Sequence, residues 1–473
     1  MTIHFPEDHP SLSRCRAATE RGRAAVRANP ILLRLASTLL LASVTLLRPA
    51  GVFGAQPDSC VIGDYRLADG SDVDIAPSEG DTLRWRKFDG TTGALHRKAE
   101  GTWVSTRGWS KSADGIVVSF AGCDAIRFAG MAGVRQHFET HEVRFDSHRT
   151  TLVGRLVLPP GDDKVPVVVL LHGSEPDSAM RDYYLQRMLP AQGIAAFVYD
   201  KRGTGGSGGS YTQDFSLLAD DAVAAVNTAR SVAGARLRRI GFQAGSEGGW
   251  VAPLAATRTA VDFAIICFGL AVNPIEEDQE AVELQLSEKG YSQAQIRDAL
   301  RVARAAEDVM ASDFSTGFAQ LDQSRSRYSG APWYHDLRGD YTYFILPKTA
   351  DELRALAPEF NWHTPWHYDS MPVLRSLRVP QLWILGGEDL DAPSAHTRRR
   401  LNELVAQGGD YTIAYYKSAE HGMTLFEVDS TGERVSTRYA PGYFQLIRDF
   451  AFSEALSGHY GDAAITRPRS GAH

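Results

Sequence analysis

The sequence predicts an α/β fold, in which a mostly parallel, doubly wound sheet follows a small antiparallel β domain. Apolar runs such as 165–171 and 263–270 are too continuous for a sheet with one face in water. They alternate with stretches of helical periodicity such as 216–232. Residues 56–134 instead show short alternating strands and hairpin turns such as Asp89-Gly90.

Residues 1–55 differ from the rest and are typical of a secretory signal peptide. An arginine-rich segment precedes the apolar run 35–47, and small residues follow that run. The run is shorter than the roughly 20 residues that a membrane span needs. We therefore expect a periplasmic or secreted protein. The alternative is an uncleaved N-terminal anchor, which would be its one contact with a membrane.

Charge and cysteine usage limit the partners and suggest the compartment. The net charge is −7 for the whole chain and +4 for residues 1–55, which leaves −11 for the rest and disfavours nucleic acid as a partner. Cys15 lies in the leader and Cys267 in an apolar strand. Cys60 and Cys123 bracket the β domain, and we expect a disulfide between them. Two unpaired buried thiols are the alternative.

The expected parts are a signal peptide or anchor (1–55), a β-rich domain (56–134), the main α/β domain (135–458) and a loose tail (459–473). Within the main domain, about 271–370 has a helical pattern that is too long for a simple connection, so we expect a helical insertion. Trp85, Trp103 and Trp109 of the β domain fit either a core or a binding platform.

The run RRIGFQAGSEGGW carries the strongest functional signal. An apolar strand ends in small residues, presents Ser246, and passes at once into an apolar helical stretch. Such a turn holds a serine Oγ out for attack, and small neighbours such as Ala244 and Gly248 avoid a collision across it. The pattern G-x-S-x-G is met except at Ala244. A loop without chemistry is the alternative.

A nucleophilic serine needs a histidine base and a carboxylate that orients the base, here in the chain order Ser, Asp, His. In VPQLWILGGEDLDAP, Asp389 is the first candidate acid and Asp391 the second. His421 follows the next strand, in the run AEHG. Each residue alone could be an ordinary loop residue, and the signal lies in their order after strands.

An oxyanion hole is expected beside this serine. VPVVVLLHGSEP is an apolar strand that ends in His172-Gly173-Ser174. The backbone N–H groups of Ser174 and Glu247 could both point at a developing oxyanion. We interpret His172 as a structural residue of the loop.

The motifs HGSEP, YDKRGTGGSGG, AGSEGGWVAP, GGEDLDAP and AEHG resemble, in order and spacing, the bacterial α/β-hydrolase carboxylesterases whose loop reads HGSGP. The resemblance covers about residues 142–456. It implies an α/β-hydrolase fold with a helical lid, and a serine hydrolase without metal or cofactor. Ser246 would be the nucleophile, Asp389 the acid and His421 the base. The sequence departs from the family at Ala244 and at Glu175, which replaces a glycine beside the expected oxyanion hole.

Two other patterns suggest different chemistry. Gly203 to Gly208 matches G-x-G-x-x-G after a strand, with Asp220 and Asp221 further on, but no helix pattern begins inside the glycine run. We interpret this segment as a structural turn. His137 and His141 would share one face of a strand, but no third ligand has supporting spacing, so no metal site is expected.

The sequence therefore predicts an exported serine hydrolase that acts on a small-molecule carboxylic ester. A peptidase, amidase or thioesterase with the same triad is the alternative. A catalytically silent module with this fold, whose β domain binds a ligand of the cell envelope, is the other class considered.

Overall fold

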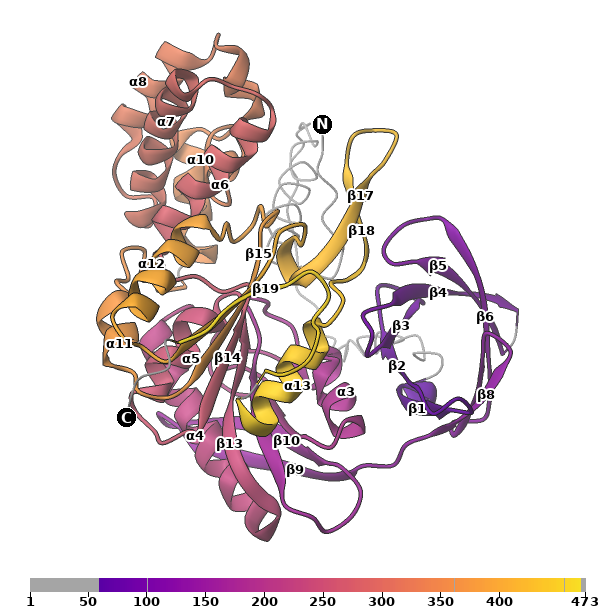
Figure 1. Cartoon of the computed structure of the whole chain (residues 1–473). Helices are drawn as coiled ribbons and strands as arrows, with labels where there is room; N and C mark the ends of the chain where they lie inside the picture. Colours follow the sequence, from indigo (N-terminus) through magenta and orange to yellow (C-terminus); the bar gives the residue numbers. More distant parts are fainter. Residues whose placement is uncertain (1–58, 100, 361, 455, 469–473) are drawn as a thin grey trace, which may run out of the picture.

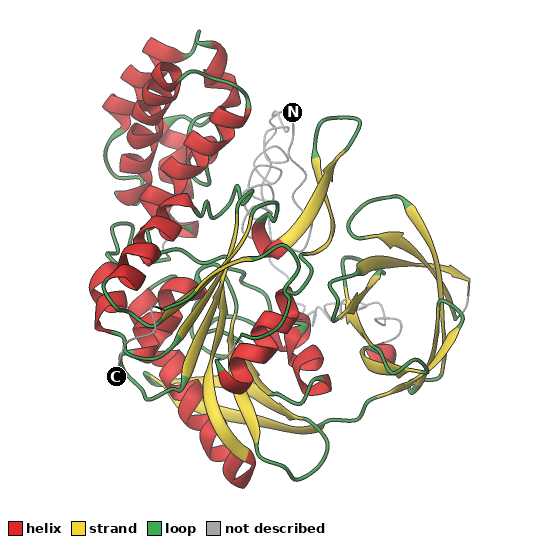
Figure 2. Ribbon diagram, in the orientation of Figure 1, coloured by secondary structure: helices red, strands yellow, loops and turns green. Residues whose placement is uncertain are grey.

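The computed structural model describes residues 59–468 except residues 100, 361 and 455. A barrel, a sheet flanked by helices and a helical insertion make up this part of the chain (Figures 1 and 2). The expected signal peptide or anchor lies outside the described residues. Within them, no helix combines the length and the apolar character that crossing a membrane requires.

Eight antiparallel strands form the barrel, which closes because β1 pairs with both β2 and β8. They are β1 (Gly63–Leu67), β2 (Asp72–Pro77), β3 (Leu83–Lys87), β4 (Thr92–Ala99), β5 (Thr102–Arg107), β6 (Ala113–Ala121), β7 (Ala125–Phe128) and β8 (Met131–Arg135). Trp85 and Trp103 are buried in its core, whereas Trp109 packs edge-on against Tyr439 of the α/β domain.

The disulfide expected for the β domain is present in the structure. Cys60, in the short 3-10 helix η1 (Ser59–Val61), is bonded to Cys123 in the turn between β6 and β7, with 5.1 Å between their Cα atoms. It ties the start of the barrel to a turn 63 residues later. Cys267 is a buried free thiol in the neighbouring domain.

The central sheet has nine strands in the order β19-β16-β15-β14-β13-β11-β12-β10-β9. They are β9 (Glu139–Ser147), β10 (Thr150–Leu158), β11 (Val165–Leu171), β12 (Ala195–Tyr199), β13 (Leu237–Gly245), β14 (Phe263–Cys267), β15 (Gln381–Gly386), β16 (Tyr411–Tyr416) and β19 (Ala464–Thr466). The six strands β11 to β16 run parallel, while β9, β10 and β19 are antiparallel to their neighbours.

Helices cover both faces of the sheet, which explains the continuous apolar runs in the sequence. Along β11, Val167 and Val169 pack in the core on one face, and Val168 and Leu170 in the core on the other. The first face carries α4 (Phe215–Ala233), α5 (Gly248–Ala256), α11 (Met371–Ser376) and α12 (Ala395–Ala406). The second carries α2 (Ala179–Asp182), α3 (Leu185–Ala191) and α13 (Tyr443–Ser453).

The helical insertion lies between β14 and β15, as the sequence predicts. It contains α6 (Pro274–Glu288), α7 (Gln293–Ala311), α8 (Phe318–Tyr328), η3 (Pro332–Asp336), α9 (Thr342–Ile345), α10 (Ala350–Leu356) and η4 (Ala357–Glu359). The sequence starts three of these helices with capping boxes, in which a polar side chain and the third helical residue satisfy each other's backbone N–H. These pairs are Asn273 with Glu276, Ser292 with Gln295, and Thr349 with Glu352.

The expectation of a loose tail over 459–473 is wrong for part of that segment. Residues 464–466 form β19, which pairs antiparallel with the edge strand β16. An edge strand presents unpaired backbone N–H and C=O groups. Residues 464–466 can pair with these groups although the segment has little apolar character. The sequence pattern was too polar to predict this strand.

The barrel packs against a two-stranded hairpin, β17 (Thr424–Val428) and β18 (Arg434–Tyr439), which stands between the barrel and the insertion in Figure 1. Trp109 N–H donates to the carbonyl oxygen of Ser436 at 2.9 Å, and Tyr439 N–H to that of Gly90 at 2.9 Å. A Cβ on Gly108 would lie 2.5 Å from the Cα of Thr437, so this approach requires glycine. The barrel is therefore firmly docked.

One ion pair of this interface is buried. The carboxylate of Asp74 in β2 is fully buried, and Arg187 of α3 binds it through two guanidinium nitrogens with a side chain only 13% exposed. Without Arg187, Asp74 keeps only the more distant guanidinium of Arg86, 3.9 Å away, and loss of one partner of a buried pair typically costs about 3 kcal/mol or more. We therefore expect Arg187→Ala to lower the free energy of unfolding by about 3 kcal/mol in urea titrations.

Arg107→Ala is the matched control for that variant. Arg107 joins the barrel to Glu427 of the hairpin, but the side chains are 45% and 59% exposed. Exposed pairs contribute under about 1 kcal/mol. Equal losses of stability for the two variants would contradict this account of the interface.

Candidate active site

Ser246 occupies a strained turn between β13 and α5. Its φ is +50°, a left-handed conformation that residues other than glycine seldom adopt. A Cβ on Gly248 would lie 2.9 Å from the carbonyl oxygen of Leu171 and 3.0 Å from the Cβ of Ala244. The turn therefore needs glycine at 248 and tolerates the methyl group of Ala244.

The candidate acid and base follow the neighbouring strands β15 and β16 and meet each other. His421 Nδ1 lies 3.1 and 3.0 Å from the two carboxylate oxygens of Asp389. Asp389 is 1% exposed and also accepts the backbone N–H groups of Asp391 and Ala392, at 3.1 and 2.7 Å. The structure thus pairs Asp389 with His421, while Asp391, the second candidate acid, lines the adjacent cavity.

The loop after β11 faces the turn of Ser246. A Cβ on Gly173 would lie 3.1 Å from the Cβ of Ser246 and 2.9 Å from Oε2 of Glu175. The candidate oxyanion donors are thus on adjoining segments, with Ser174 next to Gly173 and Glu247 next to Ser246. Tyr211 holds this loop by donating its hydroxyl to the carbonyl oxygen of Ser174 at 2.5 Å.

Lys201, just before the glycine-rich turn of residues 203–208, joins the two halves of this region. Its ammonium donates to the carbonyl oxygen of Gly173 at 2.6 Å and to Oε1 of Glu247 at 2.8 Å. Both side chains of the ion pair are buried, at 8% and 4% exposure. The available signal was a lysine two residues after a buried strand, at the same edge of the sheet as the serine.

Ser174, Ser246, Glu247 and His421 all line one cavity beneath the helical insertion. It encloses about 1250 Å³, part of it open to solvent. The convergence follows from the topology, because the carboxyl ends of parallel strands meet at one edge of the sheet. The His172 side chain instead points to Glu175, with Nδ1 3.3 Å from its carboxylate, which agrees with a structural role.

The charges around His421 set its protonation state. Burial alone would lower the pKa of His421, but the carboxylates of Asp389, Asp391 and Glu277 outweigh burial and raise it to about 9. His421 therefore carries a proton at neutral pH in the free protein. A histidine base works only in its neutral form.

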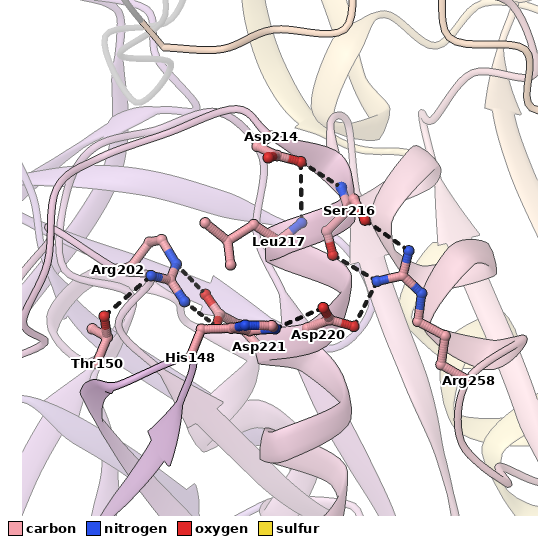
Figure 3. A network of polar contacts seen from close by, with 9 residues as sticks. All are labelled: His148, Thr150, Arg202, Asp214, Ser216, Leu217, Asp220, Asp221 and Arg258. Atoms are coloured by element: carbon pink, nitrogen blue, oxygen red, sulfur yellow. Dashed lines mark hydrogen bonds and ion pairs between the residues drawn. The ribbon is translucent and has the colours of Figure 1, made fainter.

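The other two patterns noted in the sequence have structural roles here. Around the glycine-rich loop, Arg202 forms a buried ion pair with Asp221 of α4, and Asp220 binds His148 and Arg258 (Figure 3). Both acids that a nucleotide site would need are therefore engaged within the protein. His141 Nε2 contacts Glu139 at 2.8 Å on the surface.

No group of three or more histidine, cysteine, aspartate or glutamate side chains suited to a metal ion occurs among the described residues.

Comparison with known proteins finds a family match for the central part of the chain. Residues 162–316 match the family described as "Serine aminopeptidase, S33". No curated protein matches the sequence.

Solved structures give distant likenesses. An esterase from Pyrococcus furiosus is 15% identical, with a TM-score of 0.38 over 60% of this chain and 84% of that one. An acylaminoacyl peptidase from Pyrococcus horikoshii is 15% identical, with a TM-score of 0.40 over 84% of this chain and 57% of that one. An esterase from Thermogutta terrifontis is 19% identical, with a TM-score of 0.33 over 60% of this chain and 91% of that one.

The family match and the sheet topology together show an α/β-hydrolase core with an N-terminal β-barrel, so the fold predicted from the sequence is confirmed. The matched family is one of serine hydrolases, and the match covers residues 162–316, which include Ser246.

The protonation of His421 predicts an alkaline pH dependence. On a neutral ester, kcat/KM should rise with pH up to a midpoint near 9, because deprotonation of His421 creates the base. Glu277→Gln removes one negative charge near the imidazole and should move that midpoint to lower pH. Glu283→Gln, on the same helix but outside the cavity, should leave it in place. A wild-type midpoint at the ordinary histidine value of 6.5 would contradict the assignment.

Proposed function

We propose that this chain is an exported serine hydrolase that cleaves carboxylic esters through an acyl-enzyme intermediate. One observation carries the proposal: Ser246, the His421–Asp389 pair and the loop of Ser174 converge on one cavity. None of these residues would identify a catalytic site by itself. Together they supply a nucleophile, a base, its orienting carboxylate and two backbone donors.

In the proposed reaction, Ser246 Oγ attacks the ester carbonyl carbon while His421 Nε2 takes the hydroxyl proton. Asp389 accepts the Nδ1–H and stabilises the imidazolium. The negative oxygen of the tetrahedral intermediate accepts the backbone N–H groups of Ser174 and Glu247. His421 then gives its proton to the departing alcohol. Water, activated by the same histidine, releases the acid and restores Ser246.

Amide or peptide cleavage is the second candidate, because the matched family is described as a serine aminopeptidase. The same atoms would act, with an amine as the leaving group; a thioester would lose a thiol. An ester is the preferred substrate because, in the described part of the chain, the domain before the α/β core is one eight-stranded barrel and not a β-propeller of the kind that would favour an oligopeptidase. A catalytically silent module is disfavoured, since Ser174, Ser246, Glu247 and His421 line one cavity and Asp389 is hydrogen-bonded to His421.

Export to the periplasm or the medium is also part of the proposal. Residues 1–55 have the composition of a signal peptide, with an uncleaved anchor as the alternative. The Cys60–Cys123 disulfide supports it, since disulfides persist mainly in oxidising compartments.

Fluorophosphonate labelling tests the nucleophile, and rates on short and long acyl esters and on peptide amides test the substrate class. We expect wild-type protein to be labelled and Ser246→Ala to resist. Asp389→Asn should lower kcat by about 10⁴-fold, because the imidazole loses its orienting partner. Asp391→Asn is the matched control and should cost far less.

Three results would count against the proposal. Unlabelled wild type would remove the enzymatic function, and labelling that survives Ser246→Ala would remove the site. Peptide amides cleaved faster than every ester would favour the second candidate.

A further inference from the structure

Three carboxyl groups lie around the proposed nucleophile without any role in the mechanism above. Glu277 of α6, Asp340 before α9 and Asp391 after β15 all line the cavity of Ser246. Glu277 is only 9% exposed. Within the described part of the chain, none of these three carboxylates forms a hydrogen bond or ion pair with a protein group.

One cation of the protein acts on these carboxylates, because the charge of His421 lowers the pKa of Glu277 and of Asp391. Among the described residues that line the cavity there is no lysine or arginine. His421 is engaged with Asp389, and the nearby ammonium of Lys201 is paired with Glu247. Burial of a charged carboxylate without a close partner is strongly unfavourable, so such groups either take up a proton or bind a cation from outside the chain.

The protonation behaviour of the cluster agrees with this picture. Burial raises the pKa of Glu277 well above its ordinary value; the charge of His421 lowers that pKa, and the neighbouring carboxylates of Asp389 and Asp391 raise it. Burial likewise raises the pKa of Asp340, and the charge of Glu277 adds to the effect. A cation placed among these groups would favour their charged forms.

The remaining walls of the cavity are aromatic. Tyr341 and Trp366 pack edge to face with ring centroids 4.9 Å apart, and Phe360 and Trp362 lie 4.8 Å apart. All four line the cavity. Aromatic faces attract cations, and aromatic rings beside carboxylates are the usual way in which proteins recognise quaternary ammonium groups. Apolar rings alone would suit a neutral chain, but the carboxylates would then remain without a partner.

We propose that the cavity binds a substrate carrying a positively charged nitrogen, held by Glu277, Asp340 and Asp391 between the aromatic rings. The inference rests on the proposed hydrolase function and names its substrate class: a cationic ester. The positive charge can belong to the acyl group or to the alcohol, and the two sources are separated by the substrates chosen below.

Isosteric ester pairs test the proposal, because a trimethylammonium and a tert-butyl group have nearly the same shape. The acyl pair is 4-nitrophenyl 4-(trimethylammonio)butanoate and 4-nitrophenyl 5,5-dimethylhexanoate. The alcohol pair is butyrylcholine and 3,3-dimethylbutyl butanoate. After correction for hydroxide-catalysed rates, kcat/KM should favour the cationic member of at least one pair by about tenfold or more.

Variants of the carboxylate residues test whether these groups cause the preference for cationic esters. Glu277→Gln and Asp340→Asn should each bring the ratio of cationic to neutral kcat/KM close to one. A ratio cancels effects that the variants have on His421 or on folding. The control is Asp351→Asn, whose side chain is 97% exposed on α10 of the insertion, and it should keep the wild-type ratio.

Failure of this inference can be distinguished from failure of the proposed function. Neutral esters cleaved as fast as, or faster than, their cationic isosteres would overturn the cation site and leave the hydrolase intact. If the protein cleaves neither the neutral nor the cationic esters, calorimetric titration of the Ser246→Ala variant with choline and with 3,3-dimethylbutan-1-ol tests the cation site without catalysis. Binding of choline alone supports the site, and equal binding or none overturns it.

Discussion

The proposed catalytic centre depends on one buried ammonium group, that of Lys201. Glu247 follows the nucleophile directly, and its N–H is a proposed oxyanion donor, yet its carboxylate adds a negative charge nearby. Lys201 neutralises that carboxylate and binds the carbonyl oxygen of Gly173 at the same time. A single charge therefore fixes both sides of the oxyanion hole and removes the repulsion that an anionic intermediate would meet.

The hairpin β17–β18 starts three residues after His421, the proposed base, and helps to hold it in place. Arg434 in this hairpin donates to the carbonyl oxygen of Glu388, beside the acid, at 2.6 Å and to Glu288 of the insertion at 2.8 Å. The barrel packs on the other side of the hairpin, where Trp109 donates to Ser436. The barrel, the helical insertion and the loop that contains Asp389 therefore all contact the hairpin β17–β18 next to His421.

Local sequence was enough to predict the fold class and the insertion, both of which the structure contains. It also indicated Ser246, Asp389 and His421 as candidates, because each follows a recognisable strand and turn. The role of Lys201 could not be predicted, since it depends on two partners 28 and 46 residues away. The position of Glu277 in the cavity could not be predicted either, because helical periodicity does not indicate that one face of the insertion covers a cavity. Strand β19 depends on an edge that only the assembled sheet provides.

Substitution of Lys201 by methionine tests this account most directly, because methionine keeps the length of the side chain and removes its charge. Measured on a neutral ester, kcat should fall by about 100-fold or more with little change in KM. Lys164→Met, at an exposed position, is the control, and circular dichroism would verify that both variants are folded. A folded Lys201→Met variant with wild-type kcat would contradict the central role of this ammonium group.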